Sequence, residues 1–165
     1  MKTRKNDRFS LREFTVDYDS VYSQADAIFK ENNICQWEKN EDAVWSCILN
    51  RHNSAKTEKK QDFEKDGCCM NICIYPDDFD DPAMLIKQHS AKKGCRIKSI
   101  KCKLHYCTYL RTSKDPVIIE SIQKLEILKK YFIAKYKTIW DKVPYGSTKK
   151  HWIEKYRSIS RASSS

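Results

Sequence analysis

Residues 115–141 read DPVIIESIQKLEILKKYFIAKYKTIWD and carry the strongest helical pattern in the chain. Apolar side chains recur there at steps of three and four residues, which places them on one face of an α-helix. They are Ile118, Ile122, Leu125, Leu128, Phe132, Tyr136 and Ile139. Asp115 and Pro116 are typical of a helix start, and Pro144 and Gly146 of a helix end. The pattern predicts a helix over 116–141 with this face in the core.

Weaker periodic segments lie on both sides of this helix. An apolar stripe predicts a helix over 16–31, with a stop at Asn32 and Asn33. After Gly146, Ser147 is a candidate cap for a last helix, whose inward residues would be Trp152, Tyr156 and Ile159. Asp81 and Pro82 predict a further helix over 82–92 that ends at Gly94.

Length and composition favour one mainly helical domain. The chain has 165 residues, of which 40% are hydrophobic, 33% are charged and only three are glycine. Scarce glycine with abundant Lys, Glu and Ile argues against a turn-rich β fold. We expect a small helical domain over 1–165, with tails at 1–10 and 161–165. Residues 67–110 should form an irregular cysteine-rich metal-binding lobe.

Six of the eight cysteines fall within this predicted lobe, in the run GCCMNICIYP and the later run GCRIKSIKCKLHYC. Thiolates are strong ligands for zinc and for iron–sulfur clusters. The candidate metal ligands are Cys68, Cys69, Cys73, Cys95, Cys102 and Cys107. Lysines and arginines flank most of them, which is unusual for core positions. Cys35 and Cys47 have apolar neighbours and are better interpreted as small buried residues.

The cysteine spacing indicates a site built from two halves. Cys73 and Cys95 are separated by 21 residues, and shorter gaps separate the cysteines within each half. The gaps match neither a zinc-finger C-x2-C pair nor a ferredoxin pattern, so zinc and an iron–sulfur cluster both remain open. The role of Cys68 is also open, because adjacent cysteines rarely both reach one ion. His105 is a weaker candidate ligand.

The order Cys68-Cys69-x3-Cys73, Cys95-Arg-Ile and Cys102…Cys107 resembles the YkgJ-type cysteine-cluster domains, a family of zinc- or iron-chelating proteins. The resemblance covers about 40 of the 165 residues. It implies metal chelation by Cys69, Cys73, Cys95, Cys102 and Cys107. It implies no defined reaction.

The chain is strongly basic, with a formal net charge of +10. Residues 87–111 contain eight lysines and arginines and no acidic residue. These cations would either balance a negatively charged thiolate site or bind the phosphates of a nucleic acid. An acidic protein is a further candidate partner. The candidate nucleic-acid contacts are Lys98, Lys101, Lys103 and Arg111, with Tyr106 available to stack on a base.

Several function classes lack their motifs in this sequence. It contains no phosphate-binding glycine loop, no HExxH and no G-x-S-x-G. No secretory signal and no apolar span of membrane length is visible, so we expect a cytoplasmic location. The first hypothesis is a metal-binding protein with a structural or redox site. The alternatives are a zinc-stabilised nucleic-acid-binding protein and a metal-dependent modification enzyme.

Overall fold

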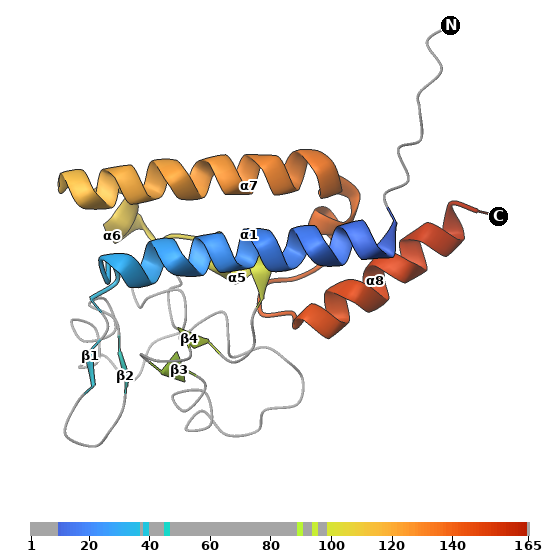
Figure 1. Ribbon diagram of the computed structural model, residues 1–165, viewed down its shortest axis with the longest axis horizontal. Coiled ribbons are helices and arrows are strands. Elements are labelled where there is room, and N and C mark those ends of the chain that lie inside the picture. Colours follow the sequence, from blue (N-terminus) through green and yellow to red (C-terminus); the bar gives the residue numbers. More distant parts are fainter. Residues whose placement is uncertain are drawn as a thin grey trace, which may run out of the picture.

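The computed structural model describes residues 10–36, 38–39, 45–46, 89–90, 94–95 and 99–164. Helices dominate these residues (Figure 1), which confirms the predicted mainly α class. Most of the predicted cysteine-rich lobe falls outside the described residues, so its irregular structure stays a prediction.

Three long helices and two single-turn helices form the described fold. They are α1 (Leu11–Glu31), α5 (Ile100–Lys103), α6 (Thr108–Arg111), α7 (Pro116–Lys142) and α8 (Lys149–Ala162). Two antiparallel pairs of two-residue strands accompany them, β1 (Glu38–Lys39) with β2 (Trp45–Ser46) and β3 (His89–Ser90) with β4 (Gly94–Cys95). The predicted helix over 82–92 is wrong at its end, because His89 and Ser90 pair as a strand with Gly94 and Cys95.

Helix α7 matches the helix predicted over 116–141 to within one residue. Asp115 accepts the Val117 N–H at 2.8 Å and caps its start. The predicted apolar face is buried: Ile118, Leu125, Phe132, Tyr136 and Ile139 all belong to the core. Non-helical torsions at Tyr136 (φ −126°, ψ 34°) kink the helix about one and a half turns before its end.

Helix α1 begins five residues earlier than the apolar stripe predicts. Ser10 accepts the Glu13 N–H at 3.1 Å, and the Glu13 carboxylate accepts the Ser10 N–H at 2.6 Å. This reciprocal capping box satisfies two backbone groups at the helix start. The extra turn also buries Phe14 in the core. The predicted stop is confirmed, because α1 ends at Glu31 with Asn32 as its C-cap, and Asn33 adopts a positive φ of 44°.

Helix α8 follows the turn at Pro144–Gly146, as predicted. Its cap is Thr148 rather than Ser147, since the Thr148 hydroxyl accepts the His151 N–H at 3.2 Å. Trp152 is fully buried, and Tyr156 and Ile159 pack against the core. The inward face predicted for this helix is therefore confirmed.

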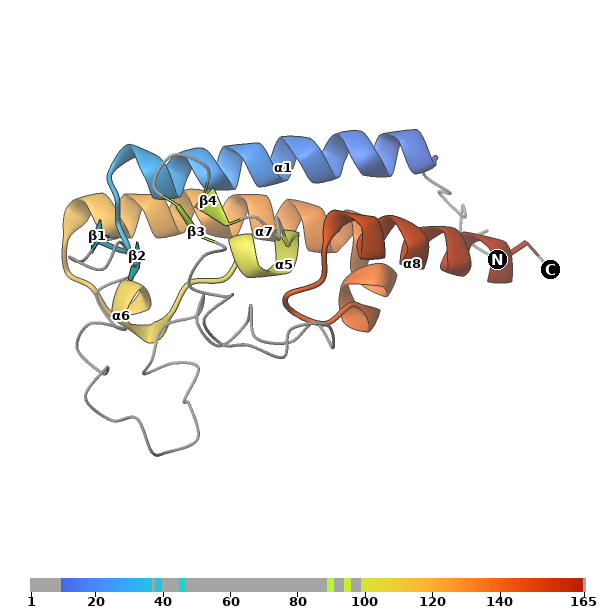
Figure 2. The same cartoon turned by 90° about the horizontal axis from the view of Figure 1, so that it is seen from below.

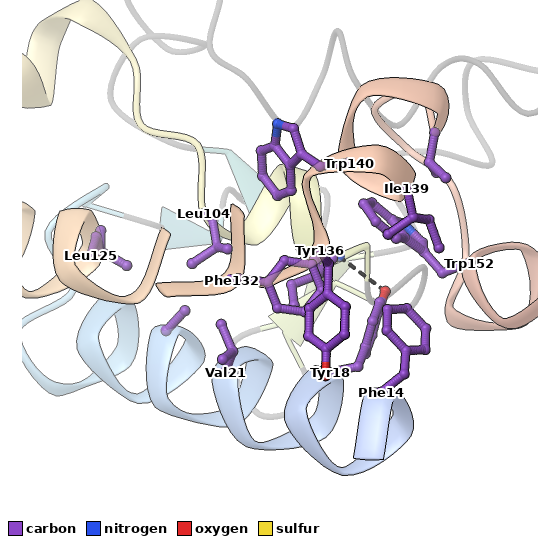
Figure 3. Close-up of a cluster of buried hydrophobic side chains, with 13 residues drawn as sticks. Phe14, Tyr18, Val21, Leu104, Leu125, Phe132, Tyr136, Ile139, Trp140 and Trp152 are labelled. Atoms are coloured by element: carbon purple, nitrogen blue, oxygen red, sulfur yellow. Dashed lines mark hydrogen bonds between the residues drawn. The ribbon is translucent and has the colours of Figure 1, made fainter. Parts of the chain in front are cut away.

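The main core lies where α1, α7 and α8 meet (Figures 1 and 2). Helices α1 and α7 run side by side in opposite directions, and α8 packs against both. An aromatic cluster fills the junction, with Phe14 edge-on to Tyr136 at 5.0 Å (Figure 3). Phe14 is also stacked on Tyr156 of α8, with ring centroids 4.5 Å apart. Such rings supply large apolar areas and restrict packing to defined geometries.

A second, smaller cluster lies near the start of α7. It consists of Ile34, Cys107, Leu110 and Ile118. Cys35 and Tyr109 pack against it from its edge. The segment 99–111 therefore runs along α7 between the two clusters, with α5 at the main core and α6 at the smaller one (Figure 2).

Candidate functional site around Cys102

Helix α5 anchors the end of the cysteine-rich segment in the main core. Ile100 and Leu104 stand four residues apart and are both fully buried. The Ile100 N–H also donates to the Tyr18 hydroxyl at 3.0 Å (Figure 3). Two buried side chains on one helical face fix the rotation of the turn. The positions of Lys101, Cys102 and Lys103 follow from that rotation.

The Cys102 sulfur accepts a hydrogen bond from a backbone N–H. The donor is Gly146, whose nitrogen lies 3.0 Å from Sγ. Gly146 has a φ of 80°, a conformation that glycine adopts without steric cost. The turn between α7 and α8 thus directs a backbone donor at a partly buried sulfur. Hydrogen bonds to sulfur stabilise the negatively charged thiolate.

A cation lies beside this sulfur. The Lys101 ammonium donates to the carbonyl oxygens of Trp140 and Val143, at 2.8 and 2.9 Å. Partial burial lowers the pKa of Lys101, while the negative charges of Asp141 and a Cys102 thiolate oppose that shift. The ammonium also lies 5.1 Å from the centre of the Tyr145 ring. The charges of Lys101 and a Cys102 thiolate attract each other, and a nearby cation favours the thiolate form of a cysteine.

Two further ionisable side chains complete the neighbourhood of Cys102. The His105 ring packs edge-on against Tyr145, with centroids 5.8 Å apart. Burial raises the pKa of Tyr145, and the negative charge of a Cys102 thiolate raises it further. Cys102, Lys101, His105 and Tyr145 therefore form one group of soft and ionisable side chains beside the end of α7. A thiolate in such a setting can bind a soft metal ion or act as a nucleophile.

The basic residues predicted to bind nucleic acid make contacts within the fold. Lys103 forms an ion pair with Asp26 at 2.7 Å, and Lys101 binds the carbonyl groups at the end of α7. Arg111 lies over the Tyr106 ring at 5.8 Å. The Tyr106 hydroxyl donates to Glu126, and burial together with this bond raises the pKa of Tyr106 to about 12.

These contacts give four of the five candidate residues a structural role. Lys98 lies outside the described residues. Nucleic-acid binding by this segment stays a prediction, but Lys103 is already paired with the Asp26 carboxylate, and Lys101 already donates to backbone carbonyl groups of the fold.

The two candidate metal ligands whose side chains are described lie in different surroundings. Cys102 faces the turn after α7, whereas Cys107 is 7% exposed within the smaller cluster beside Ile118, near the start of α7. Figure 2 shows α5 and α6 at separate positions along α7. The described contacts of Cys102 and Cys107 therefore do not bring the two sulfurs together in one site. The surroundings of Cys107 are those of a buried apolar side chain.

The other candidate ligands lie in or next to the segment that is not described. Cys68, Cys69 and Cys73 fall outside the described residues, and only the backbone of Cys95 is described, in β4. Within the described residues, no three His, Cys, Asp or Glu side chains are grouped as a metal site. Metal ligation by all six cysteines stays a prediction.

Gly146 and Tyr145 belong to this site, although the sequence does not predict them as site residues. The sequence indicates Gly146 only as a helix breaker. The Pro-x-Gly turn is visible there, but its partner Cys102 lies 44 residues away in the chain. A single sequence contains no signal that pairs them.

Comparisons with protein-family models, curated proteins and solved structures found no match. In the part of the chain that the structure describes, no helix is long and apolar enough to span a bilayer.

Proposed function

We propose that the protein binds a metal through cysteine thiolates, with Cys102 as the ligand that is fixed to the helical core. The observation that supports the proposal is the hydrogen bond from the Gly146 N–H to the Cys102 sulfur at 3.0 Å. Hydrogen bonds to sulfur tune thiolate metal centres, and outer contacts of this kind orient their ligands. The nearby Lys101 ammonium offsets part of the negative charge that several thiolates would bring together.

The remaining ligands in this proposal come from Cys68, Cys69, Cys73 and Cys95. Cys95 stands only seven residues before Cys102 in the chain. A connection of that length allows both sulfurs to reach one ion while α5 stays packed in the core. Cys107 is the weaker candidate of the described pair, because it already packs among apolar side chains.

The role that fits this arrangement is a structural or redox site. Ligation at Cys102 would tie the cysteine-rich segment to α5 and, through Gly146, to the turn between α7 and α8. Metal binding to such a segment contributes directly to its folding free energy. Zinc and an iron–sulfur cluster both suit a set of thiolates, and they differ in colour and redox activity.

The test is the metal content of protein purified without oxygen. Elemental analysis should find zinc or iron in the wild type, and visible absorbance should distinguish a cluster from zinc. Cys102→Ser should lose most of the metal, whereas the matched variant Cys107→Ser should keep it. A metal-free wild type, or a Cys102→Ser variant with full metal content, would overturn the proposal.

A further inference from the structure

The net positive charge of the protein is distributed unevenly among its helices. Helix α8 carries five lysines and arginines and a single acid, Glu154, within 14 residues. Helix α1, by contrast, carries two cations and five acids within 21 residues. A helix with one dominant sign of charge creates a local field that attracts ligands of the opposite sign.

Three of the α8 cations form a row on its exposed side. Lys150, Arg157 and Arg161 are all exposed, and separations of seven and four residues bring them onto one face of the helix. Their backbone positions are about 10 Å and about 6 Å apart along the helix axis. Glu154 lies near the same row and reduces its charge by one.

These cations are not used to hold the fold together. The ion pair described for α8 joins Lys149 to Asp19 at 2.7 Å. No described ion pair or hydrogen bond involves the side chains of Lys150, Arg157 or Arg161 within residues 99–164 and the other described segments. Lys101 and Lys103 show the opposite pattern, since both make short contacts inside the fold.

The apolar face of α8 is already covered by the core, which disfavours a membrane surface as the ligand. Amphipathic helices bind membranes by inserting an uncovered apolar face. Here Trp152 is fully buried, and none of the exposed large apolar residues in the described structure belongs to α8. A partner that binds the row must therefore be recognised by charge rather than by apolar contact.

The same geometry favours a duplex over a single strand. Proteins that bind single strands stack bases on exposed rings. The aromatic residues of α8 are unsuited to this, because Trp152 is buried and Tyr156 stacks on Phe14 at 4.5 Å. An acidic protein surface fits less well, because the anchors of protein interfaces include Trp and Tyr side chains, and this row offers only cations.

We propose that the exposed row Lys150–Arg157–Arg161 binds the phosphate backbone of a nucleic-acid duplex without reading its sequence. This inference does not rest on the proposed metal site. It also places the interface on α8 rather than on the basic segment 87–111 that the sequence indicates.

The test is the binding of the full-length protein to a short labelled DNA duplex at several salt concentrations, read by fluorescence anisotropy. The variant K150Q/R157Q/R161Q removes three cations from α8. The control K124Q/K130Q/K137Q removes three exposed cations from α7 and changes the net charge equally. The plot of log binding constant against log salt concentration has a negative slope. Its steepness should decrease by roughly 0.9 for each phosphate that the variant no longer neutralises, and thus by about 2 to 3 in the α8 variant. The α7 control should keep most of the wild-type slope.

Four results would overturn the proposal. The first is that the wild type does not bind the duplex at low salt, and the second is that both triple variants lose the same amount of duplex affinity. The third is that the protein binds single-stranded RNA more tightly than the duplex. The fourth is that polyglutamate competes for the protein as well as unlabelled duplex does. Circular dichroism should confirm that both variants are folded. Unchanged duplex binding by Cys102→Ser would show that this surface works independently of the metal site.

Discussion

The ammonium group of Lys101 lies 2.9 Å from the carbonyl oxygen of Val143, the C-cap residue of α7. It also donates to the Trp140 carbonyl at 2.8 Å. The last carbonyl groups of a helix have no partners within the helix, and a cation there also interacts favourably with the helix dipole. Lys101 therefore ties α5 to the end of α7, which is the same connection that positions Cys102 beside Gly146.

Replacing Lys101 should therefore destabilise the protein. In Lys101→Met, two partly buried carbonyl groups lose a charged donor, and hydrogen bonds to charged groups contribute about 1.5–3 kcal/mol. After a discount for partial solvent exposure, we expect the free energy of unfolding to fall by about 1–2 kcal/mol. Urea denaturation measures this change. The exposed Lys150→Met is the matched control and should change stability by less than about 0.5 kcal/mol.

Two residues two positions apart on α7 provide a test of the predicted core. Leu125 is 0% exposed in the main core, and Ile127 is 68% exposed. Leu125→Ala should lower the free energy of unfolding by about 2–5 kcal/mol, because it creates a cavity. Ile127→Ala should stay within about 0.5 kcal/mol of the wild type. Similar losses in both variants would show that the orientation of α7 is different.

The ion pairs of Asp26 predict how stability depends on pH. Burial raises the pKa of Asp26, but Lys103 and Lys30, each 2.7 Å away, lower it by more, so it lies below 3.8. A carboxyl whose pKa is depressed on folding stabilises the protein above its unfolded-state pKa. That contribution is lost as the pH falls through the folded-state pKa.

Asp26→Asn should accordingly lower the melting temperature at neutral pH by about 2–4 °C, which corresponds to roughly 1 kcal/mol. The difference from the wild type should shrink as the pH falls through the depressed pKa of the wild-type carboxyl, because that carboxyl then also becomes neutral. Thermal unfolding followed by circular dichroism at several pH values measures both effects. Glu120→Gln, which removes an exposed ion pair with Lys124, should cause almost no change at any pH.

Local patterns are sufficient to predict the long helices. The three- and four-residue spacing from Ile118 to Ile139 predicts both α7 and its buried face, because seven apolar residues in helical register over several turns are hard to obtain by chance. The apolar stripe misses the start of α1 for a local reason that is readable in the sequence, namely the Ser10-x-x-Glu13 capping box. Helix α5 is not predicted from the sequence, because a helix of a single turn is too short to show a periodic pattern of apolar residues.

The contacts of the candidate site cannot be predicted in the same way. The sequence indicates Lys101 and Lys103 as phosphate-binding residues, because a sequence shows charge but not the groups within the fold that bind the charged side chain. Their partners, Val143 and Asp26, lie 42 and 77 residues away in the chain. Such pairs follow from the packing of α5 against α1 and the end of α7, which is a property of the whole fold.

Gly146→Ala should affect both stability and the Cys102 site. Gly146 has a φ of 80°, and a Cβ in that region costs about 1–2 kcal/mol. We expect a loss of stability of that size, as measured by urea denaturation. Relief of the strain would also move the N–H away from the Cys102 sulfur, so the metal content should fall relative to the wild type. Ser147→Ala, one residue further along the same turn, keeps its backbone geometry and should leave both quantities unchanged. If Gly146→Ala loses stability but retains all its metal, this hydrogen bond does not support ligation at Cys102.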